Sequence, residues 1–458
     1  MNGTPALSML EAVRGQVVTA HSPEYDDARS VYNGMIDRHP LAVVRAVDVT
    51  DVRVTVAAAR ESGLDLAIRA GAHSVPGFGT VDDGIVLDLS PMKGIRIDPE
   101  KRVGRVQAGC TWADFDHAAH GFGLATTGGI ISTTGVAGLT LGGGIGYLAR
   151  AYGLSIDNLR SVDVVLADGS FVTASEDEHA DLFWALRGGG GNFGVVTEFE
   201  FDLHPVDTIY GGPMFFELAD AEALLTTYRD WIAAAPRAMG AFAAFQIAPP
   251  LPFVPEDRVG EPFLLLVSCF NGPDADAEAL LADLRSVAKP VAEHVGRMPY
   301  PALNSAFDGL LPAGLQHYWK AAFLPELTDG AIAAHLEHGP KVPALQSTMH
   351  LYPIDGAVQD VAPDATAFAY RDARFAPVIA GMWPDPADNE ANTAWVRDYH
   401  AALEPHTSAG GYINFMAGDD QSRIRANYGT NYDRLAAVKK TYDPHNLFHL
   451  NQNIAPAS

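Results

Sequence analysis

The sequence predicts an α+β fold that is built from two regions and a tail. Over residues 40–89, short β-branched runs alternate with a stretch of helical spacing, which is typical of strands that are connected by a helix. After Pro205 the glycine clusters stop, and longer helical stretches alternate with strands that are bounded by proline. From Gly410 the composition is again rich in glycine and asparagine, as in the first region, so we expect the tail to pack back on that region. The expected divisions are residues 1–207, 208–407 and 408–458.

In the first region, β-branched runs predict strands, and an apolar period of about 3.6 residues predicts helices. The pair Asp168-Gly169 lies between two β-rich runs and therefore predicts a hairpin. The expected strands are 41–46, 66–69, 85–89, 105–108, 161–166, 171–174 and 195–203. The expected helices are 52–62, 112–120 and 181–186.

The second region combines longer elements of both kinds. Helical spacing extends over 219–235 and 275–287, and strands are expected over 262–269 and 347–352. The chain has 458 residues, of which 48% are hydrophobic and 19% are charged, so it has enough apolar surface for a sizeable core.

Charge and composition exclude several classes of partner. The formal net charge of −25 would repel phosphate backbones and anionic lipid, so neither nucleic acid nor a membrane surface is an expected partner. No apolar run approaches the ~18 residues that a membrane span needs. The first residues lack a basic start and a long apolar stretch, and Cys110 and Cys269 are too isolated for a disulfide framework. We therefore expect a cytoplasmic protein with two buried thiols.

Three glycine-rich segments are the candidate binding elements. The turn over 69–74 leaves a strand, and its backbone N–H groups could converge on an anion. The segment 128–138 alternates small residues with hydroxyls, which lets the backbone lie flat against a planar ligand. The segment 141–146 is not the dinucleotide fingerprint, because it lies outside a plain βαβ unit. Each segment alone is compatible with an ordinary loop, but the three together favour a large flat cofactor that carries phosphates.

Several motifs occur in order over nearly the whole chain. They are Arg69-Ala70-Gly71-Ala72-His73-Ser74, Thr133-Thr134-Gly135-Val136-Ala137-Gly138, Gly142-Gly143-Gly144-Ile145-Gly146-Tyr147 and Tyr442-Asp443-Pro444-His445-Asn446-Leu447-Phe448. This series resembles the flavin-linked oxidases of the vanillyl-alcohol oxidase type, and within them the berberine-bridge-enzyme branch. Among its members, 6-hydroxy-D-nicotine oxidase and the bacterial flavoenzyme of enterocin biosynthesis are similar in length and layout.

The resemblance implies a PCMH-type FAD-binding domain of two subdomains, with its core at about 36–207. It also implies an α+β substrate domain with an antiparallel sheet over 208–407, and a berberine-bridge-type segment over 408–458 that returns to the FAD domain.

In this family the histidine of the first motif carries the flavin 8α-methyl group, which here is His73. Such a bond raises the flavin potential and prevents loss of the cofactor. Many plant members add a second link through a cysteine, but Ile131 stands at that position, so we expect a single covalent bond.

The same resemblance assigns further contacts with FAD. Residues 69–74 would wrap the pyrophosphate, and Thr134 would border the approach of dioxygen to the flavin. Tyr412 resembles an active-site residue, and the remaining residues resemble contacts with the cofactor. The expected contacts are Arg69, Ala70, Gly71, Ala72, His73, Ser74, Thr133, Thr134, Gly135, Gly138, Leu139, Gly142, Gly191, Val196, Asn414, Asn451 and Asn453.

The catalytic base of the family lies on a strand of the substrate domain and is often Glu. The matching strand here is 348–353, and its period of two places His350 and Tyr352 on one face. Because imidazole titrates near neutral pH, His350 could accept a hydroxyl proton as hydride leaves. Tyr352 is the second candidate, and a buried histidine with a structural role is the alternative for the first.

Other residues have weaker signals. His117 and His120, and likewise His445 and His449, have helical spacing that could hold a metal ion, but no third ligand accompanies them and we expect no metal site. The tryptophans of the second region are expected to belong to the core, with stacking on a substrate as the alternative. These are Trp319, Trp383 and Trp395.

The expected function is an FAD-dependent oxidase that acts on a small organic or secondary-metabolite substrate. A base takes a proton, hydride passes to the flavin, and O₂ reoxidises the flavin to give hydrogen peroxide. One alternative is an enzyme that inserts oxygen into a polyketide-like substrate. An alternative of another class is a flavoprotein that binds a ligand without turnover. A dehydrogenase that does not use O₂ is a further alternative, against which Thr134 argues.

Overall fold

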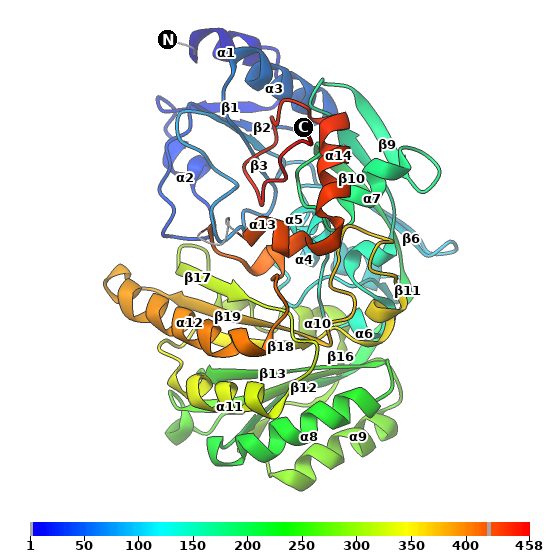
Figure 1. Cartoon of the computed structure of the whole chain (residues 1–458), viewed down its shortest axis with the longest axis vertical. Coiled ribbons are helices and arrows are strands. Elements are labelled where there is room, and N and C mark those ends of the chain that lie inside the picture. The colour runs from blue at the N-terminus through cyan, green and yellow to red at the C-terminus, as the bar shows by residue number, and fades with distance from the viewer. Residues whose placement is uncertain (1–2, 419–422) are drawn as a thin grey trace.

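The computed structural model describes residues 3–418 and 423–458, whose strands form four sheets (Figure 1). The α+β class predicted from the sequence is confirmed, because helices and largely antiparallel sheets occupy separate layers. Within the described residues, no helix combines the length and the apolar character that crossing a membrane requires. The α-helices are α1 (Gly3–Leu10), α2 (Tyr25–Arg29), α3 (Val49–Ser62), α4 (Trp112–His120), α5 (Val136–Leu141), α6 (Ala149–Tyr152), α7 (Ala180–Leu186), α8 (Ala221–Ala234), α9 (Asp274–Val287), α10 (Tyr300–Asn304), α11 (Asp329–His338), α12 (Asn389–Leu403), α13 (Ile424–Tyr428) and α14 (Tyr432–Tyr442).

The first sheet contains the strand–helix alternation that the sequence predicts. Strands β2, β4 and β3 are parallel, and β1 adds to the edge in the antiparallel sense. Helix α3 begins at Val49, earlier than expected, because the Asp48 side chain accepts the N–H groups of Thr50 and Asp51. The strands, in spatial order, are β1 (Gln16–Thr19), β2 (Ala42–Arg45), β4 (Ile85–Asp88) and β3 (Leu66–Arg69).

The second sheet is antiparallel and includes the predicted hairpin. Val165 pairs with Phe171 across the turn, and Gly169 there has a φ of +85°, which glycine adopts without strain. A separate two-stranded sheet pairs β11 (His204–Pro205) with β7 (Leu124–Ala125). The strands of the second sheet, in spatial order, are β5 (Ile95–Asp98), β6 (Val103–Gln107), β10 (Val195–Asp202), β8 (Leu159–Val165) and β9 (Phe171–Ser175).

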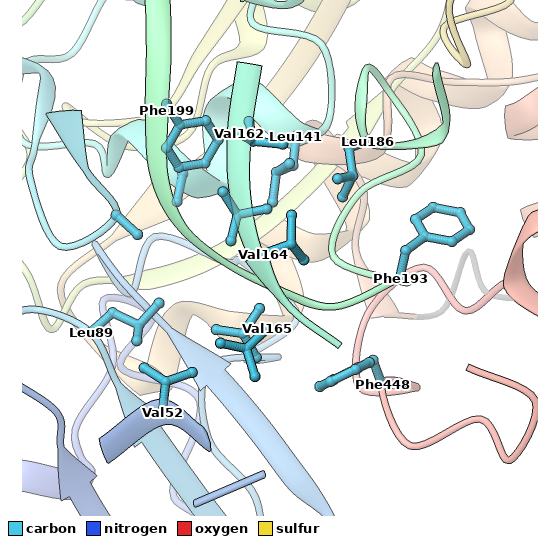
Figure 2. Close-up of a cluster of buried hydrophobic side chains, with 14 of the residues drawn as sticks. Val52, Leu89, Leu141, Val162, Val164, Val165, Leu186, Phe193, Phe199 and Phe448 are labelled. Carbon is cyan, nitrogen blue, oxygen red and sulfur yellow. The ribbon is translucent and has the colours of Figure 1, made fainter. Parts of the chain in front are cut away.

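One hydrophobic cluster joins the first region to the tail. Figure 2 shows Val162 and Val164 of β8 beside Phe199 of β10, and Phe448 of the tail approaches the same group. Leu435 of α14 belongs to this cluster as well. The C-terminal segment therefore packs on the first region, as Figure 1 also shows for α14 near β10.

A larger antiparallel sheet dominates the second region and separates two layers. Its strands, in spatial order, are β15 (Ala292–Glu293), β12 (Thr208–Phe216), β14 (Pro262–Phe270), β13 (Met239–Ile247), β18 (Thr348–Pro353), β19 (Phe375–Trp383) and β17 (Gln316–Ala321), and β16 (Gly296–Pro299) pairs with β12. Alternate residues such as Ala241, Ala243 and Phe245 belong to a cluster with α8, α9, α11 and α12. Phe242 and Ala244 belong to a different cluster on the side of the first region. Figure 1 shows these helices on the outer face of the sheet.

A buried ion pair fixes the tail. The ammonium group of Lys439 is fully buried and donates to the Asp443 carboxylate at 2.6 Å. It also donates to the carbonyl oxygens of Asn192 at 2.6 Å and Phe448 at 2.9 Å. Asp443 in turn accepts the N–H groups of Leu447 and Phe448. Because both charges are paired and hydrogen-bonded, the cost of burying them is offset, and the tail is held against the glycine-rich turn at 188–194.

Asp116 on α4 gives stability a dependence on pH. Its carboxyl group is buried and accepts a hydrogen bond of 2.6 Å from Nδ2 of Asn304, and burial raises its pKa to about 7. The folded chain therefore keeps a proton that the unfolded chain releases, and the free energy of unfolding falls as pH rises from about 4 to 7. We expect Asp116→Asn to raise the free energy of unfolding at pH 8 by at most about 4 kcal/mol, and by much less at pH 4.

Urea unfolding at several pH values measures this effect, and Asp114→Asn on the same helix is the matched control. Burial raises the Asp114 pKa, but hydrogen bonds from Lys93 and Thr111 outweigh burial and lower it below its usual value. The control should therefore be less stable than the wild type at pH 7, and this difference should shrink below pH 4. An Asp116 variant whose pH profile parallels that of the wild type would contradict the assignment.

Candidate active site

A cavity of about 350 Å³ lies between the glycine-rich segments of the first region and the large sheet. The turn that follows β3 forms one part of its wall, and the loops on either side of α5 form another. Strands β13, β14, β18, β19 and β17 cover it, and the tail contributes Phe448 and Asn451. Segments from all three parts of the chain are thus needed to enclose this space.

The turn at 69–74 offers backbone rather than charge to the cavity. The N–H groups of residues 71–74 donate to no other described residue, so they are available to an anion. The Arg69 guanidinium is buried and donates to the Asp88 carboxylate at 2.7 Å and to the carbonyl oxygen of Ala28 at 2.6 Å. The guanidinium of Arg69 is therefore already paired and is not available to a pyrophosphate. Only the backbone of Arg69 could take part in wrapping one.

The imidazole of His73 lines the cavity and is held from two sides. Its ring stacks on Tyr32 with centroids 4.0 Å apart, and it hydrogen-bonds to the backbone of Thr133. Burial lowers the His73 pKa to about 4, and the Thr133 hydrogen bond only partly opposes this shift. The ring is therefore neutral at physiological pH, with the lone pair of one nitrogen unprotonated.

Glycines shape the wall beside this turn. Gly71 and Gly135 meet back to back, and a Cβ on Gly135 would lie 2.6 Å from the backbone nitrogen of Gly71. A Cβ on Gly138 or Gly191 would instead meet nothing within 4 Å, because both residues border the open cavity. Gly142 does not line the cavity, and it leaves room for the amide of Asn414.

The tail places a network of neutral polar groups at the cavity. The Tyr412 hydroxyl oxygen accepts the Gly144 N–H at 2.8 Å and Nδ2 of Asn414 at 2.9 Å. The same Asn414 amide donates to the carbonyl oxygen of Leu139 at 2.9 Å. Burial raises the Tyr412 pKa, its accepted hydrogen bonds lower it, and the net value is about 12. Tyr412 is therefore a neutral phenol whose oxygen is fixed in place.

The large sheet presents side chains to the cavity in rows across its strands. Phe242 of β13 lies beside Tyr352 of β18, with ring centroids 5.2 Å apart. In the next row, Ala244 pairs with His350. One further row contains Gln246, Thr348, Ala380 and Trp319, which are successive register partners across β13, β18, β19 and β17. These residues line the cavity because strand side chains alternate between the two faces of a sheet.

His350 and Tyr352 form a pair, as the shared strand face predicted. Nδ1 of His350 and the Tyr352 hydroxyl oxygen are 2.6 Å apart. Burial lowers the His350 pKa to about 3 and raises the Tyr352 pKa well above its usual value. The expectation that His350 titrates near neutral pH is therefore wrong, because desolvation beneath the sheet disfavours imidazolium. Both side chains are neutral at physiological pH.

Comparison with known proteins identifies the family. An FAD binding domain matches residues 40–175, and a domain described as berberine and berberine like matches residues 411–455. An FAD-linked oxidoreductase of Dictyostelium discoideum is 32% identical over 455 residues, which cover 97% of this chain and 96% of that protein. The chain belongs to the berberine-bridge-enzyme-like family of FAD-linked oxidoreductases.

Other relatives of this berberine-bridge-enzyme-like chain agree with the assignment. The (R)-6-hydroxynicotine oxidase of Paenarthrobacter nicotinovorans is 32% identical over 462 residues, or 97% of each chain. The crystal structure of 6-hydroxy-D-nicotine oxidase from Arthrobacter nicotinovorans has a TM-score of 0.87 at 26% identity and covers 99% of both chains. A glucooligosaccharide oxidase from Acremonium strictum, described as carrying 6-S-cysteinyl, 8α-N1-histidyl FAD, has a TM-score of 0.86 at 23% identity and shares the fold. The family predicted from the sequence motifs is confirmed, and its cofactor is FAD.

The residues present fit FAD. The open space beside Gly138 and Gly191 and the unpaired N–H groups at 71–74 suit a large ligand that carries phosphates. Most of the predicted contacts surround this one cavity. Those that line it are Arg69, Ala70, Gly71, Ala72, His73, Ser74, Thr134, Gly135, Gly138, Leu139, Gly191, Val196, His350, Tyr352, Tyr412, Asn414 and Asn451.

Three predicted contacts do not line the cavity. Thr133 is exposed, although its backbone bonds to His73, and Gly142 lies behind Asn414. Asn453 is partly buried, and its Oδ1 atom has no hydrogen-bond partner among the described residues. We keep their direct contact with FAD as a prediction only.

Sequence reasoning missed several residues of the covering sheet. Trp319 packs partly against the core, as expected, but it also lines the cavity. Gln246 and Phe242 were not singled out, although a lone glutamine in an otherwise apolar run is a signal that could have been used. Of the two histidine pairs considered for a metal, His120 lies 3.3 Å from Asp207, and His449 lies 3.4 Å from Asp65.

The close approach of Gly71 and Gly135 leads to a prediction. Gly71→Ala would place a Cβ against the backbone of Gly135, which cannot move without displacing α5. We expect the purified variant to contain at most about a tenth of the wild-type FAD, measured from flavin absorbance per chain. Gly296→Ala on β16, where a Cβ meets nothing within 4 Å, should keep the normal FAD content. Full occupancy in the Gly71 variant would show that this approach does not shape the site.

Proposed function

We propose that the chain is an oxidase with FAD attached to His73 and with O₂ as electron acceptor. The observation that carries the proposal is that His73 and the His350–Tyr352 pair line the same cavity. When bound, FAD supplies the acceptor for a substrate hydride and passes the two electrons to O₂, which takes up two protons and becomes hydrogen peroxide. The relative named for (R)-6-hydroxynicotine supports a small organic substrate.

The state of His73 supports a single covalent link. A neutral imidazole has a lone pair with which to form a bond, and the low pKa of His73 keeps that lone pair unprotonated. The contacts with Tyr32 and Thr133 fix the orientation of the ring. Ile131 lines the cavity at the position where plant members carry the second linking cysteine, and its side chain cannot form a bond. We therefore propose attachment through His73 alone.

We assign removal of the substrate proton to Tyr352 and His350. The Tyr352 oxygen accepts the proton from the substrate hydroxyl or amine, while its own proton passes to Nδ1 of His350 over 2.6 Å. This route requires the His350 tautomer in which Nε2 carries the ring proton. Burial disfavours the imidazolium that results, so the proton moves only as hydride leaves, when the substrate group becomes strongly acidic. Because both groups begin neutral, the buried pair holds no net charge before the substrate arrives.

Two further residues have proposed roles beside this pair. The Tyr412 oxygen already accepts two hydrogen bonds, so its own proton remains available to a bound molecule. Thr134 lines the cavity with a small hydroxyl side chain, and we propose that it borders the route of O₂. The divisions at 207 and 407 also remain proposals, as does a cytoplasmic location, which two unpaired buried cysteines support.

Flavin spectroscopy tests the proposal. Candidate alcohols and amines are mixed with the protein without oxygen, and air is then admitted. We expect a true substrate to bleach the flavin band, and air to restore it with one equivalent of hydrogen peroxide. Reduced flavin that persists in air would contradict the oxidase assignment, and label from ¹⁸O₂ in the product would favour the oxygenating alternative.

A further inference from the structure

Gln246 is a buried polar side chain with no hydrogen-bond partner among the residues that the structure describes. Its exposed fraction is 7%, it lines the cavity, and its amide forms no hydrogen bond with any other described residue. Its neighbour across the strand, Thr348, donates instead to the carbonyl oxygen of Phe245. Because the amide is accessible only from the cavity, a molecule that binds there is placed to supply its hydrogen-bond partner.

The space next to Gln246 is enclosed by aromatic rings. Phe242 lies 4.8 Å from His350 and 5.2 Å from Tyr352 between ring centroids. Phe415 lies 5.8 Å from Tyr352 and 6.2 Å from Trp319. All five residues line the cavity. Rings at such separations favour a flat aromatic molecule, which they contact by face and by edge.

Charge and size narrow the choice of molecule further. Of the described residues that line the cavity, only Arg69 carries a permanent charge, and Asp88 neutralises it. An anionic substrate would therefore lose its hydration without gaining an ion pair. Ala244 stands between Phe242 and Gln246 on the same strand face, so its small side chain leaves a depression opposite His350 that can accept a ring.

We propose that this site takes a neutral aromatic substrate and that Gln246 determines its orientation. The carbon to be oxidised lies beside the hydrogen-bonded pair of His350 and Tyr352, and a hydroxyl or carbonyl at the far side of the ring forms a hydrogen bond with the Gln246 amide. Gln246 lies two residues along β13 from Ala244, which is a separation of roughly 7 Å and matches the width of a bicyclic ring. This inference rests on the proposed oxidase function.

Two probes that differ in one hydroxyl test it. They are 2-naphthalenemethanol and 6-hydroxy-2-naphthalenemethanol, and the half-saturation concentration is taken from the rate of anaerobic flavin bleaching. For the wild-type holoenzyme we expect a value roughly tenfold lower with the hydroxylated probe, equivalent to about 1.4 kcal/mol. Gln246→Met keeps the length of the side chain and should abolish the difference between the two half-saturation concentrations. Gln359→Leu removes an exposed glutamine outside the cavity and should preserve the difference.

Each outcome bears on the proposal. Equal half-saturation for the two probes in the wild type would overturn the role of Gln246, and this comparison needs no variant to fold. Faster bleaching by cellobiose or by 6-(hydroxymethyl)-2-naphthoate than by either neutral probe would overturn the substrate class. If no probe bleaches the flavin, binding is read from the shift of its absorption band, and no shift with either neutral probe overturns the inference. Failure of the oxidase function has a separate sign, because dithionite-reduced flavin would then not reoxidise in air.

Discussion

Tyr352→Phe should slow anaerobic flavin reduction by a factor of about 100 to 1,000 while leaving FAD bound. The substitution removes the oxygen to which we assign the substrate proton and also breaks the 2.6 Å contact with His350. The ring itself remains, so its stacking with Phe415 and its packing against Phe242 are preserved. Stopped-flow absorbance at saturating substrate measures the effect on the limiting rate.

Tyr147→Phe is the matched control for this experiment. Tyr147 is also buried against Phe242, but its hydroxyl has no hydrogen-bond partner among the described residues and does not line the cavity. The control should reduce at the wild-type rate. A Tyr352 variant with normal kinetics would assign proton removal to another group.

We also expect the wild-type rate of flavin reduction to show no ionisation of His350 between pH 5 and 8, because the folded pKa of about 3 keeps the imidazole neutral throughout this range.

His73→Ala should release all of the covalently bound flavin. After acid precipitation, the yellow colour should stay in the supernatant for the variant and in the pellet for the wild type. Turnover should also fall, by roughly 10- to 100-fold, because the flavin loses the potential that an 8α-linked imidazole confers. Absorbance of both fractions and steady-state oxygen consumption measure the two effects.

His317→Gln is the control for the His73 variant. His317 also contacts Tyr32, with the two rings tilted and their centroids 4.7 Å apart, but it does not line the cavity. Burial lowers its pKa to about 3, so it is neutral like His73. Covalent flavin should survive in this variant. Flavin that pellets with His73→Ala would place the bond on a different residue.

Elements with local signals could be predicted from the sequence. Helix α4 has the predicted bounds because Thr111 and Asp114 form a capping box at its start, and Gly121 follows its end. The hairpin at Asp168-Gly169 depends on one turn, and the turn after β3 depends on a short motif. The family and its FAD cofactor could be predicted because several such motifs occur along the chain in the order that is typical of the family.

Features that depend on distant partners could not be predicted. Strands β12, β13 and β19 are buried on both faces, so their apolar runs lack the alternation that indicates a strand. Arg69 pairs with Asp88 only because the parallel register of β3 and β4 places them side by side. The low pKa of His350 likewise results from the sheet that covers it, which its own strand does not reveal.

The buried ion pair between Lys439 and Asp443 has a consequence for how the enzyme is made. The lining of the cavity begins at Tyr32, but Asn451 and Gln452 complete its wall, and the ion pair that holds this segment joins Lys439 and Asp443 to Asn192 and Phe448. While a ribosome still holds the last part of the chain, the FAD pocket has an open side. A closed FAD site therefore requires residues 439–452 as well as the glycine-rich segments, so a chain that lacks them would have no enclosed pocket for the cofactor.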